Sequence, residues 1–234
     1  MKQHSVQEAY LKSFEDNGRI WAHEMATKPP RHIPAKKCTM EVDFQNHDTE
    51  HFQNRNIEKP AIEVIRALQK GEPIDNDKAE KLFMWSELHL LRNQKFRSYD
   101  EMDYSKNYHY LTEIESKFRR YFCYLSVYRC SGEEYFITSD NPVMDLSVNG
   151  FLVRIFSLSP DCLVLMSPIP ELLKTDISFP EMVNSSLYAN RYKYVFSNRR
   201  VLPLESYELN ATKFRLKGSL TTQTVIPQLI PEFK

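Results

Sequence analysis

The sequence predicts a mixed α+β fold in which N-terminal helices pack on a largely antiparallel sheet formed mainly by the C-terminal half. Apolar residues recur at helical spacing over the first half, and segments rich in aromatic and β-favouring residues follow over the second half. No repeat or clear linker divides the chain, so we expect one domain over residues 1–234. Its expected parts are a helical part over about 1–118, a sheet-rich part over about 119–204 and an extended tail over 205–234.

The N-terminal segment predicts a short helix followed by a strand. Ser5 and Glu8 have the spacing of a capping box, which satisfies free backbone N–H groups in the first turn of a helix. Asn17 and Gly18 can adopt the left-handed conformation that ends a helix and turns the chain. The apolar residues that follow predict a strand over 19–25.

Prolines divide the next part of the chain. The segment 26–51 contains prolines at positions 29, 30 and 34, which oppose both a helix and a central strand, so we expect a long irregular connection. Pro60 suits the first turn of a helix, and Gly71 is placed to end that helix.

The longest predicted helix begins at Asp75 and Asn76, which can cap it. Its apolar residues go most of the way around the helical cylinder, and this pattern predicts a central, buried helix. We expect this helix to end near 94–98 and a further helical stretch to follow over 104–118.

The second half of the chain predicts strands. Residues 121–128 and 134–139 are rich in aromatic and β-favouring residues and are joined by a short segment that contains Gly132, which indicates a hairpin. Further along, the pattern predicts three more strands with one helix among them. These elements are strands at 152–156, 163–166 and 192–197 and a helix at 181–191.

The composition excludes several classes of protein. Lysine plus arginine and aspartate plus glutamate both number 31, so no overall basic field attracts nucleic acid and any such contact must be local. No apolar run reaches the roughly 20 residues that cross a bilayer, and no secretion signal is seen, so we expect a cytoplasmic protein without membrane contact. The four cysteines lack paired spacing, the five glycines build no phosphate-binding loop, and no motif identifies a cofactor or an oligomeric state.

Four local patterns occur in a specific order. They are HSVQEAYLKSF (4–14), GRIW (18–21), QKFRS (94–98) and FITSDNPV (136–143), and similar residues continue through 156–160 and 184–197. Together these patterns resemble the uncharacterised bacterial domain-of-unknown-function family 4238 over most of the chain. That family has no established activity, so the resemblance implies positions of interest and not a reaction. Gln7 and Tyr99 stand where the family usually has proline.

Gln94 and Arg97 are the candidate substrate-binding pair. They are three residues apart, so on a continuing helix they project from one face near its C-terminal end. An amide beside a guanidinium binds phosphate or carboxylate well. The alternative is that Arg97 pairs with a neighbouring acid and only supports the end of the helix.

The candidate catalytic residues are His4 and Asp140. An imidazole such as that of His4 suits proton transfer near neutral pH, and the alternative is that it binds backbone carbonyls or faces solvent. Asp140 can orient His4 or hold a metal-bound water, while Ser139 and Asn141 donate hydrogen bonds to substrate oxygens. The alternative is a purely structural turn, because Asp and Asn side chains fold back readily onto the backbone before Pro142.

Two weaker patterns concern metal ions and nucleic acids. His47 and His51 are four residues apart, which on a helix places two imidazoles on one face as zinc ligands. The polar surroundings favour a solvated loop instead, and no metal site is expected. The basic pairs at 36–37, 119–120 and 199–200 are the other pattern, because tyrosines near two of them can stack on bases. The alternative for these pairs is a set of solvated faces.

The leading functional hypothesis is a hydrolase that acts on a phosphate-containing substrate such as RNA or a nucleotide. It requires folding to bring His4, Arg97 and Asp140 into one recess. Two alternatives remain open: a non-enzymatic interaction module of a bacterial defence or toxin system, which needs a protein partner, and a small-anion sensor anchored by Arg97.

Overall fold

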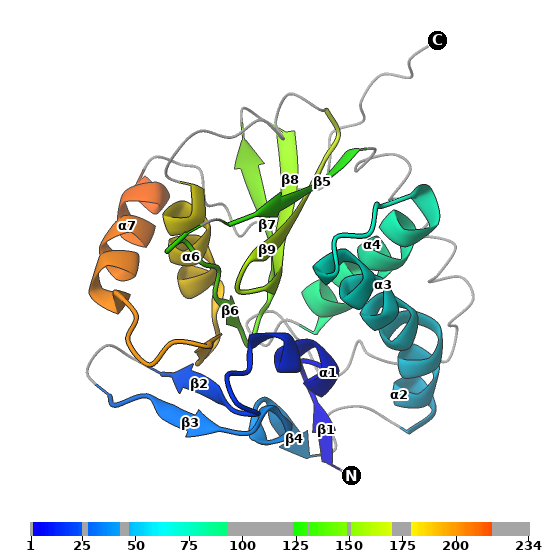
Figure 1. Ribbon diagram of the computed structural model, residues 1–234, viewed down its shortest axis with the longest axis horizontal. Coiled ribbons are helices and arrows are strands. Elements are labelled where there is room, and N and C mark those ends of the chain that lie inside the picture. Colours follow the sequence, from blue (N-terminus) through cyan, green and yellow to red (C-terminus); the bar gives the residue numbers. More distant parts are fainter. Residues whose placement is uncertain are drawn as a thin grey trace.

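The computed structural model has a mixed α+β fold with N-terminal helices, C-terminal strands and two four-stranded antiparallel sheets (Figure 1). The predicted fold class is confirmed. Within the described residues, no helix is both long enough and apolar enough to cross a bilayer. The structure describes residues 2–24, 28–42, 47–92, 124–130, 132–148, 151–169 and 179–216.

Two helices lie where the sequence predicts them. Helix α3 (Lys59–Gln69) has a proline in its first turn, and Gly71 just after its end adopts the left-handed conformation with φ +84°. Helix α4 (Asn76–Leu91) begins at Asp75, whose carboxylate accepts a hydrogen bond from the backbone N–H of Lys78 at 2.8 Å. Both helix starts are therefore confirmed. The structure ends α4 at Leu91, and the helix expected over 104–118 lies outside the described residues.

The segment 26–51 was expected to be irregular, and this expectation is wrong. It contains strand β3 (Arg31–Ile33), a 3-10 turn η2 (Ala35–Lys37) and strand β4 (Met40–Val42). Strand β4 pairs antiparallel with β1 (Lys2–His4) in a two-stranded sheet. The prolines are compatible with these strands because they lie outside them, and β3 and β4 pair on one side only.

A continuous helical segment leads into α3. It starts with α2 (His47–Gln53), which begins inside the segment expected to be irregular, and passes through one π-helical stretch, η3 (Asn54–Glu58). The loop expected around His47 and His51 is therefore a helix. In this region the chain forms helix because its apolar residues from Ile57 onward pack on the core.

The first of the two sheets, here called the central sheet, has the strand order β5-β9-β8-β7. Its two inner strands, β8 (Phe151–Ser159) and β9 (Cys162–Ser167), form a hairpin. Its outer strands are β5 (Tyr124–Arg129), which pairs with β9, and β7 (Val143–Val148), which pairs with β8. The two inner strands confirm the prediction, and β7 is not among the predicted strands.

The second sheet has the strand order β3-β2-β10-β6. Strands β2 (Ile20–His23) and β10 (Val195–Ser197) confirm two predicted strands, and β6 (Thr138–Ser139) lies at one edge. Asn17 and Gly18, with φ of 51° and 74°, make the expected left-handed turn before β2. Pairing of β2 with β10 brings together segments that are about 170 residues apart in the sequence.

The first helix begins later than the capping box predicts. Helix α1 (Glu8–Leu11) continues as the 3-10 turn η1 (Lys12–Phe14), and its N-cap position is Gln7, whose side chain makes no capping hydrogen bond. The hydroxyl of Ser5 donates instead to the carbonyl of Thr39 at 3.2 Å. The capping box is therefore wrong, because Ser5 lies in the preceding bend and hydrogen-bonds to a distant segment.

The hairpin predicted from residues 121–128 and 134–139 is also wrong. Strand β5 pairs with β9 in the central sheet, whereas β6 pairs with β10 in the second sheet. The segment between β5 and β6 crosses the turn of the β8–β9 hairpin, where the backbone N–H of Phe136 donates to the carbonyl of Pro160 at 2.7 Å. Strand β5 lies close to its predicted place, only residues 138–139 of the second predicted strand are a strand, and the partners of both are distant in the sequence.

Two helices follow the central sheet in the chain. Helix α6 (Phe179–Asn190) confirms the helix predicted over 181–191. Helix α7 (Leu204–Leu216) occupies the start of the expected extended tail, so that expectation is wrong over 205–216, and 217–234 lie outside the described residues. Tyr207 of α7 is buried against α6, and this apolar contact explains why the chain is helical there.

Helices cover both faces of the central sheet (Figure 1). Phe156 and Val164 point to the face covered by α3 and α4, and Ile155 and Leu165 point to the face covered by α6 and α7. Successive side chains of each strand point to opposite faces of the sheet, so the strand contributes to two separate apolar layers, one on each face. The second sheet adds Phe196 to the layer that contains α3 and α4.

Candidate functional site

The turn predicted to carry a site connects β6 to β7. Asp140 in this turn is 4% exposed, and its carboxylate accepts hydrogen bonds from three consecutive backbone N–H groups. The distances are 2.8 Å from Tyr192, 2.7 Å from Lys193 and 2.8 Å from Tyr194. Burial raises the pKa of Asp140, and the three N–H groups act in the opposite direction. This carboxylate holds the loop between α6 and β10 in place.

The polar neighbours of Asp140 make similar internal contacts. The hydroxyl of Ser139 donates to the carbonyl of Asn141 at 2.7 Å and accepts from its N–H at 3.1 Å. The side chains of Asn141 and Asn190 each donate to the other residue's carbonyl at 3.0 Å. These contacts fasten the end of α6 to the turn and support its structural interpretation. The substrate-binding roles of Ser139 and Asn141 stay a prediction.

The other predicted site residues are not placed beside this turn. The backbone of His4 belongs to β1 and is paired with Met40, and its side chain is not described. Gln94 and Arg97 lie outside the described residues. The structure therefore brings Ser139, Asp140 and Asn141 together, and the proposed meeting of His4, Arg97 and Asp140 stays a prediction.

Three of the segments that suggested the family resemblance meet at Tyr10, which is completely buried. Its hydroxyl lies 2.8 Å from the hydroxyl of Thr138 and donates to the carbonyl of Ser157 at 2.7 Å. Burial raises the pKa of the Tyr10 phenol, which stays neutral. The three segments 4–14, 136–143 and 156–160 thus share one hydrogen-bonded centre, which joins α1 to both four-stranded sheets.

A second buried polar group, which the sequence reasoning missed, lies at the end of α4. Arg92 donates to Glu58 of η3 at 2.5 Å and to Gln53 of α2 at 2.6 Å. One turn earlier, His89 packs against Trp85 with ring centroids 4.2 Å apart, and its Nε2 has no hydrogen-bond partner. Burial, and then the charge of Arg92, hold the pKa of His89 well below its usual value. The sequence did contain a signal for this group: His89 and Arg92 are polar residues three apart in a helix that was expected to be buried.

The second sheet carries a strong excess of positive charge. Segments 19–37 and 191–200 contain nine lysine and arginine residues and one acidic residue, Glu24. Because the whole chain has no net charge, the rest of it carries an acidic excess of eight. Pairing of β2 with both β3 and β10 places the two segments side by side at the lower edge of Figure 1. The nine residues, here called the basic sheet surface, are Arg19, Lys28, Arg31, Lys36, Lys37, Arg191, Lys193, Arg199 and Arg200.

Aromatic rings are interleaved with these charges. Trp21 of β2 and His32 of β3 stack with centroids 4.2 Å apart and planes 6° from parallel, and the guanidinium of Arg200 lies 5.8 Å from the Trp21 ring centre. Arg31 and Lys193 lie 5.2 Å and 5.0 Å from the ring centre of Tyr194. All three cations are exposed, and the rings are partly exposed.

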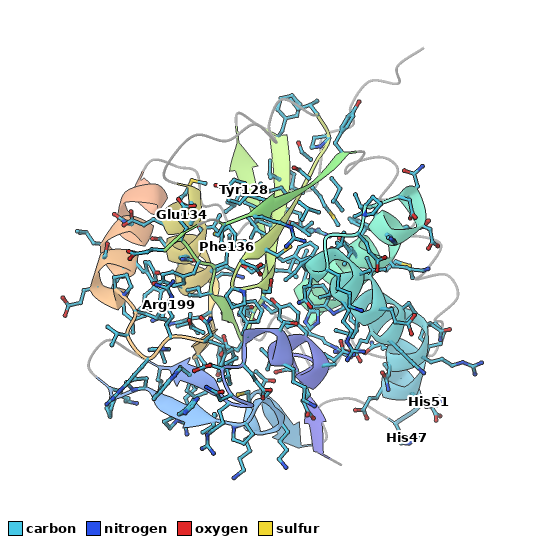
Figure 2. The ribbon with its side chains drawn as sticks, in the orientation of Figure 1. His47, His51, Tyr128, Glu134, Phe136 and Arg199 are labelled. Carbon is cyan, nitrogen blue, oxygen red and sulfur yellow. The ribbon has the colours of Figure 1, made fainter. Side chains whose placement is uncertain are left out.

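Arg199 extends the basic sheet surface upward toward α6 and α7. Its guanidinium lies 3.8 Å from the ring centre of Tyr135, and Figure 2 shows it below Glu134 and Phe136. The carbonyl of Arg199 lies 3.1 Å from Nε2 of His23, so the backbone at this position is tied to β2. The second sheet and the segments that flank its strands thus carry mostly exposed cations, an arrangement that suits binding of a large anion.

Comparison with known proteins identifies no relative, so the function has to be inferred from the side chains described above. No family model, curated protein or solved structure matches the chain. Membership of family 4238 therefore stays a prediction that rests on the sequence patterns. The basic sheet surface and the buried group at the end of α4 are two places where the described residues gather charge, and the buried ion pairs of Arg154 are a third.

Proposed function

We propose that this protein binds RNA on the basic sheet surface. The observation that carries the proposal is the excess of positive charge: the paired segments of a chain without net charge hold nine cations and Glu24, and the acids Glu15 and Asp16 lie next to Ala35 and Arg19. Phosphate groups of a polynucleotide bind to such a surface because each contact releases condensed counterions. The overall neutrality of the chain does not prevent this, since charges more than about 8 Å away are largely screened at physiological ionic strength.

The aromatic rings favour a nucleic acid over a simple polyanion. Trp21 and His32 lie beside Arg200, and Tyr194 lies beside Arg31 and Lys193, so a base that stacks on either set of rings has a cation next to it. Arginine beside an aromatic ring also retains donors for phosphate oxygens, because contact with the ring uses only the face of the guanidinium. The loop that carries Lys193 is held by Asp140, so the cations are positioned before the ligand arrives.

Binding is the part of the sequence-based hypothesis that the geometry supports best. The expected substrate contains phosphate, and the basic sheet surface suits that chemistry. Hydrolysis needs a further step from His4 and Asp140, and Asp140 already accepts three backbone N–H groups at less than 3 Å. RNA hydrolysis therefore stays a hypothesis to be tested on the bound complex.

The decisive experiment compares two triple variants that remove the same charge. Arg31→Gln/Lys193→Gln/Arg200→Gln lowers the charge of the basic sheet surface, and Lys59→Gln/Arg66→Gln/Lys70→Gln removes three exposed cations on or next to α3. Binding of fluorescent single-stranded RNA is measured by anisotropy between 50 and 200 mM salt. We expect the first variant to bind more weakly and its slope of log affinity against log salt to fall by about 2, because each lost phosphate contact removes about 0.7.

The control variant should bind RNA within about twofold of the unmodified protein. Equal affinity of all three proteins would refute the proposal and favour a protein-interaction module. Gel analysis of the RNA after incubation tests hydrolysis separately. Cleavage that is lost in His4→Gln would support the hydrolase hypothesis, and intact RNA in a stable complex would exclude it and leave binding in place.

A further inference from the structure

Helix α2 places two histidines on one exposed face. His47 and His51 are four residues apart, and their rings are 6.3 Å apart between centroids with planes only 4° from parallel. Both residues are exposed, and the side chain of His47 has 75% relative accessibility. Figure 2 shows the two labelled residues next to each other at the start of α2, on the opposite side of the molecule from Arg199.

Chelation of a metal ion by these two imidazoles requires the rings to turn from their stacked arrangement, so that one nitrogen of each points to a common centre. A first-row metal lies about 2.0–2.1 Å from each ligating nitrogen, so the two nitrogens must come to about 3 Å from each other. For imidazoles bound to one metal at adjacent positions, that geometry puts the ring centres roughly 5 Å apart. Closing the 6.3 Å separation by this small amount needs only side-chain rotation, since exposed rings pack against little else.

The local charges are compatible with a bound cation. The N-terminus of a helix carries about half a positive charge, which opposes a cation near His47. Asp48 and Glu50 lie in the same first turn and carry two negative charges, which exceed that partial charge. Oδ1 of Asp48 lies 3.7 Å from Nδ1 of His47.

We propose that His47 and His51 form a binding site for a divalent transition-metal ion, of the class of Zn²⁺, Ni²⁺ and Cu²⁺. Imidazole nitrogen suits these ions, and two nitrogens at helical spacing bind the same ion. The described residues include no group of three or more histidine, cysteine, aspartate or glutamate residues able to hold a metal, so within them the proposed site has two protein ligands. It is independent of RNA binding.

Titration of the untagged, full-length protein with Ni²⁺ in an isothermal calorimeter tests the site. We expect one saturable site at pH 7.5, and His47→Ala and His51→Ala should each weaken it at least tenfold because one imidazole cannot chelate. The control His32→Ala removes a histidine that is stacked on Trp21 and should leave Ni²⁺ affinity unchanged.

Two results would overturn the proposal. One is the absence of saturable Ni²⁺ binding to the unmodified protein. The other is retention of the same affinity by either single variant, which would place the bound ion elsewhere. Circular dichroism of each variant checks that α2 stays helical, and since both histidines are exposed, replacement by the stronger helix former alanine should preserve it.

Discussion

The central sheet and the second sheet differ in whether their charged side chains are buried or exposed. Helices cover both faces of the central sheet, and every residue of β9 is buried. In the second sheet the inner strand β10 is buried too, but the edge strand β3 is partly exposed and exposed cations flank the strands. A charge on an inner strand of the central sheet must therefore be paired within the protein, whereas the exposed charges beside the second sheet stay in water and remain available to a ligand.

Arg154 of β8 shows what pairing in the central sheet requires. It is 2% exposed and donates to both oxygens of Asp145, at 2.7 and 2.9 Å. It also donates to Glu87 at 2.5 Å and to Ser86 at 3.0 Å, both on α4. Its guanidinium lies 5.0 Å from the ring centre of Phe83. One arginine thus ties two strands to the helix that covers them.

The largest effect should follow when this pairing is broken. Arg154→Met leaves Asp145 and Glu87 without their cation in a largely buried position, so we expect the free energy of unfolding to fall by about 3–5 kcal/mol. Urea unfolding followed by circular dichroism measures the change. The matched substitution Arg200→Met on the second sheet should cost less than about 0.5 kcal/mol. Similar losses for both variants would contradict the contrast between the sheets.

A smaller effect is expected at the junction of the two sheets. Asp140 follows β6 of the second sheet and precedes β7 of the central sheet. Asp140→Asn replaces one accepting oxygen with an amide that cannot accept, so at least one of the three N–H groups loses its partner, and we expect a loss of about 1–3 kcal/mol. Asp48→Asn, at a fully exposed position, is the control. A stability equal to that of the unmodified protein would show that the turn is held by other contacts.

Acid should lower the free energy of unfolding through two buried histidines, His89 on α4 and His23 on β2, and His89 should contribute more. The pKa of His89 on α4 is held well below that of an unfolded histidine, and the pKa of His23 on β2 is lowered too, both mainly by burial. Below about pH 6.5 the unfolded chain therefore binds protons that the folded protein does not, and stability falls as pH decreases, by at most about 1.4 kcal/mol per pH unit for each histidine.

Urea unfolding at several pH values between 7.5 and 5 checks this prediction. His89→Gln should reduce the slope of stability against pH more than His23→Gln does, because His89 has the larger displacement of pKa. Asp140 has the opposite effect on stability at lower pH. Because its pKa is raised, the folded protein binds a proton there more readily than the unfolded chain does, which stabilises the folded state. An unchanged slope in His89→Gln would mean that this imidazole is protonated in the folded protein.

The smallest effect on stability should come from the basic sheet surface. Lys193→Gln removes an exposed charge, so we expect the free energy of unfolding to change by no more than about 0.5 kcal/mol. RNA affinity should nevertheless fall in the same variant, because one phosphate contact is lost. Thermal unfolding and anisotropy on one preparation measure both quantities. A stability loss as large as that of Arg154→Met would mark Lys193 as structural.

The helices were predictable because their signals are local. Pro60 and Gly71 bracket α3, and Asp75 caps α4 through a contact only three residues along the chain. The apolar face of each helix follows from its spacing in the sequence. The capping box at Ser5 failed because a distant carbonyl, that of Thr39, competes for the same hydroxyl.

The strands were found, but their partners were not. A run of β-favouring residues identifies an extended segment, and alternation identifies its two faces, yet neither names the neighbouring strand. The proposed hairpin paired neighbours in sequence, whereas β5 pairs with β9 and β6 with β10. The apolar layers beneath the helices decide this arrangement.

The sequence predicted the polar turn of the candidate site, but not the contacts of that turn, the buried His89 or the basic sheet surface. The polar residues Ser139 to Asn141 were identified because they follow an apolar run. Their partners at 190–194 are about fifty residues away, so their structural role needed the fold. His89 was missed because it lies within an apolar helix, and the neutral total charge concealed the basic sheet surface.

The sequence alone determined the fold class, the positions of the main helices and inner strands, and the spacing of His47 and His51. These features depend on contacts within a few residues, where the chain's own geometry sets the distances. Only the tertiary structure decided which strands pair, which charges are buried in pairs, and that segments 19–37 and 191–200 lie side by side. Those outcomes depend on which distant apolar faces pack together, and local periodicity does not encode that choice.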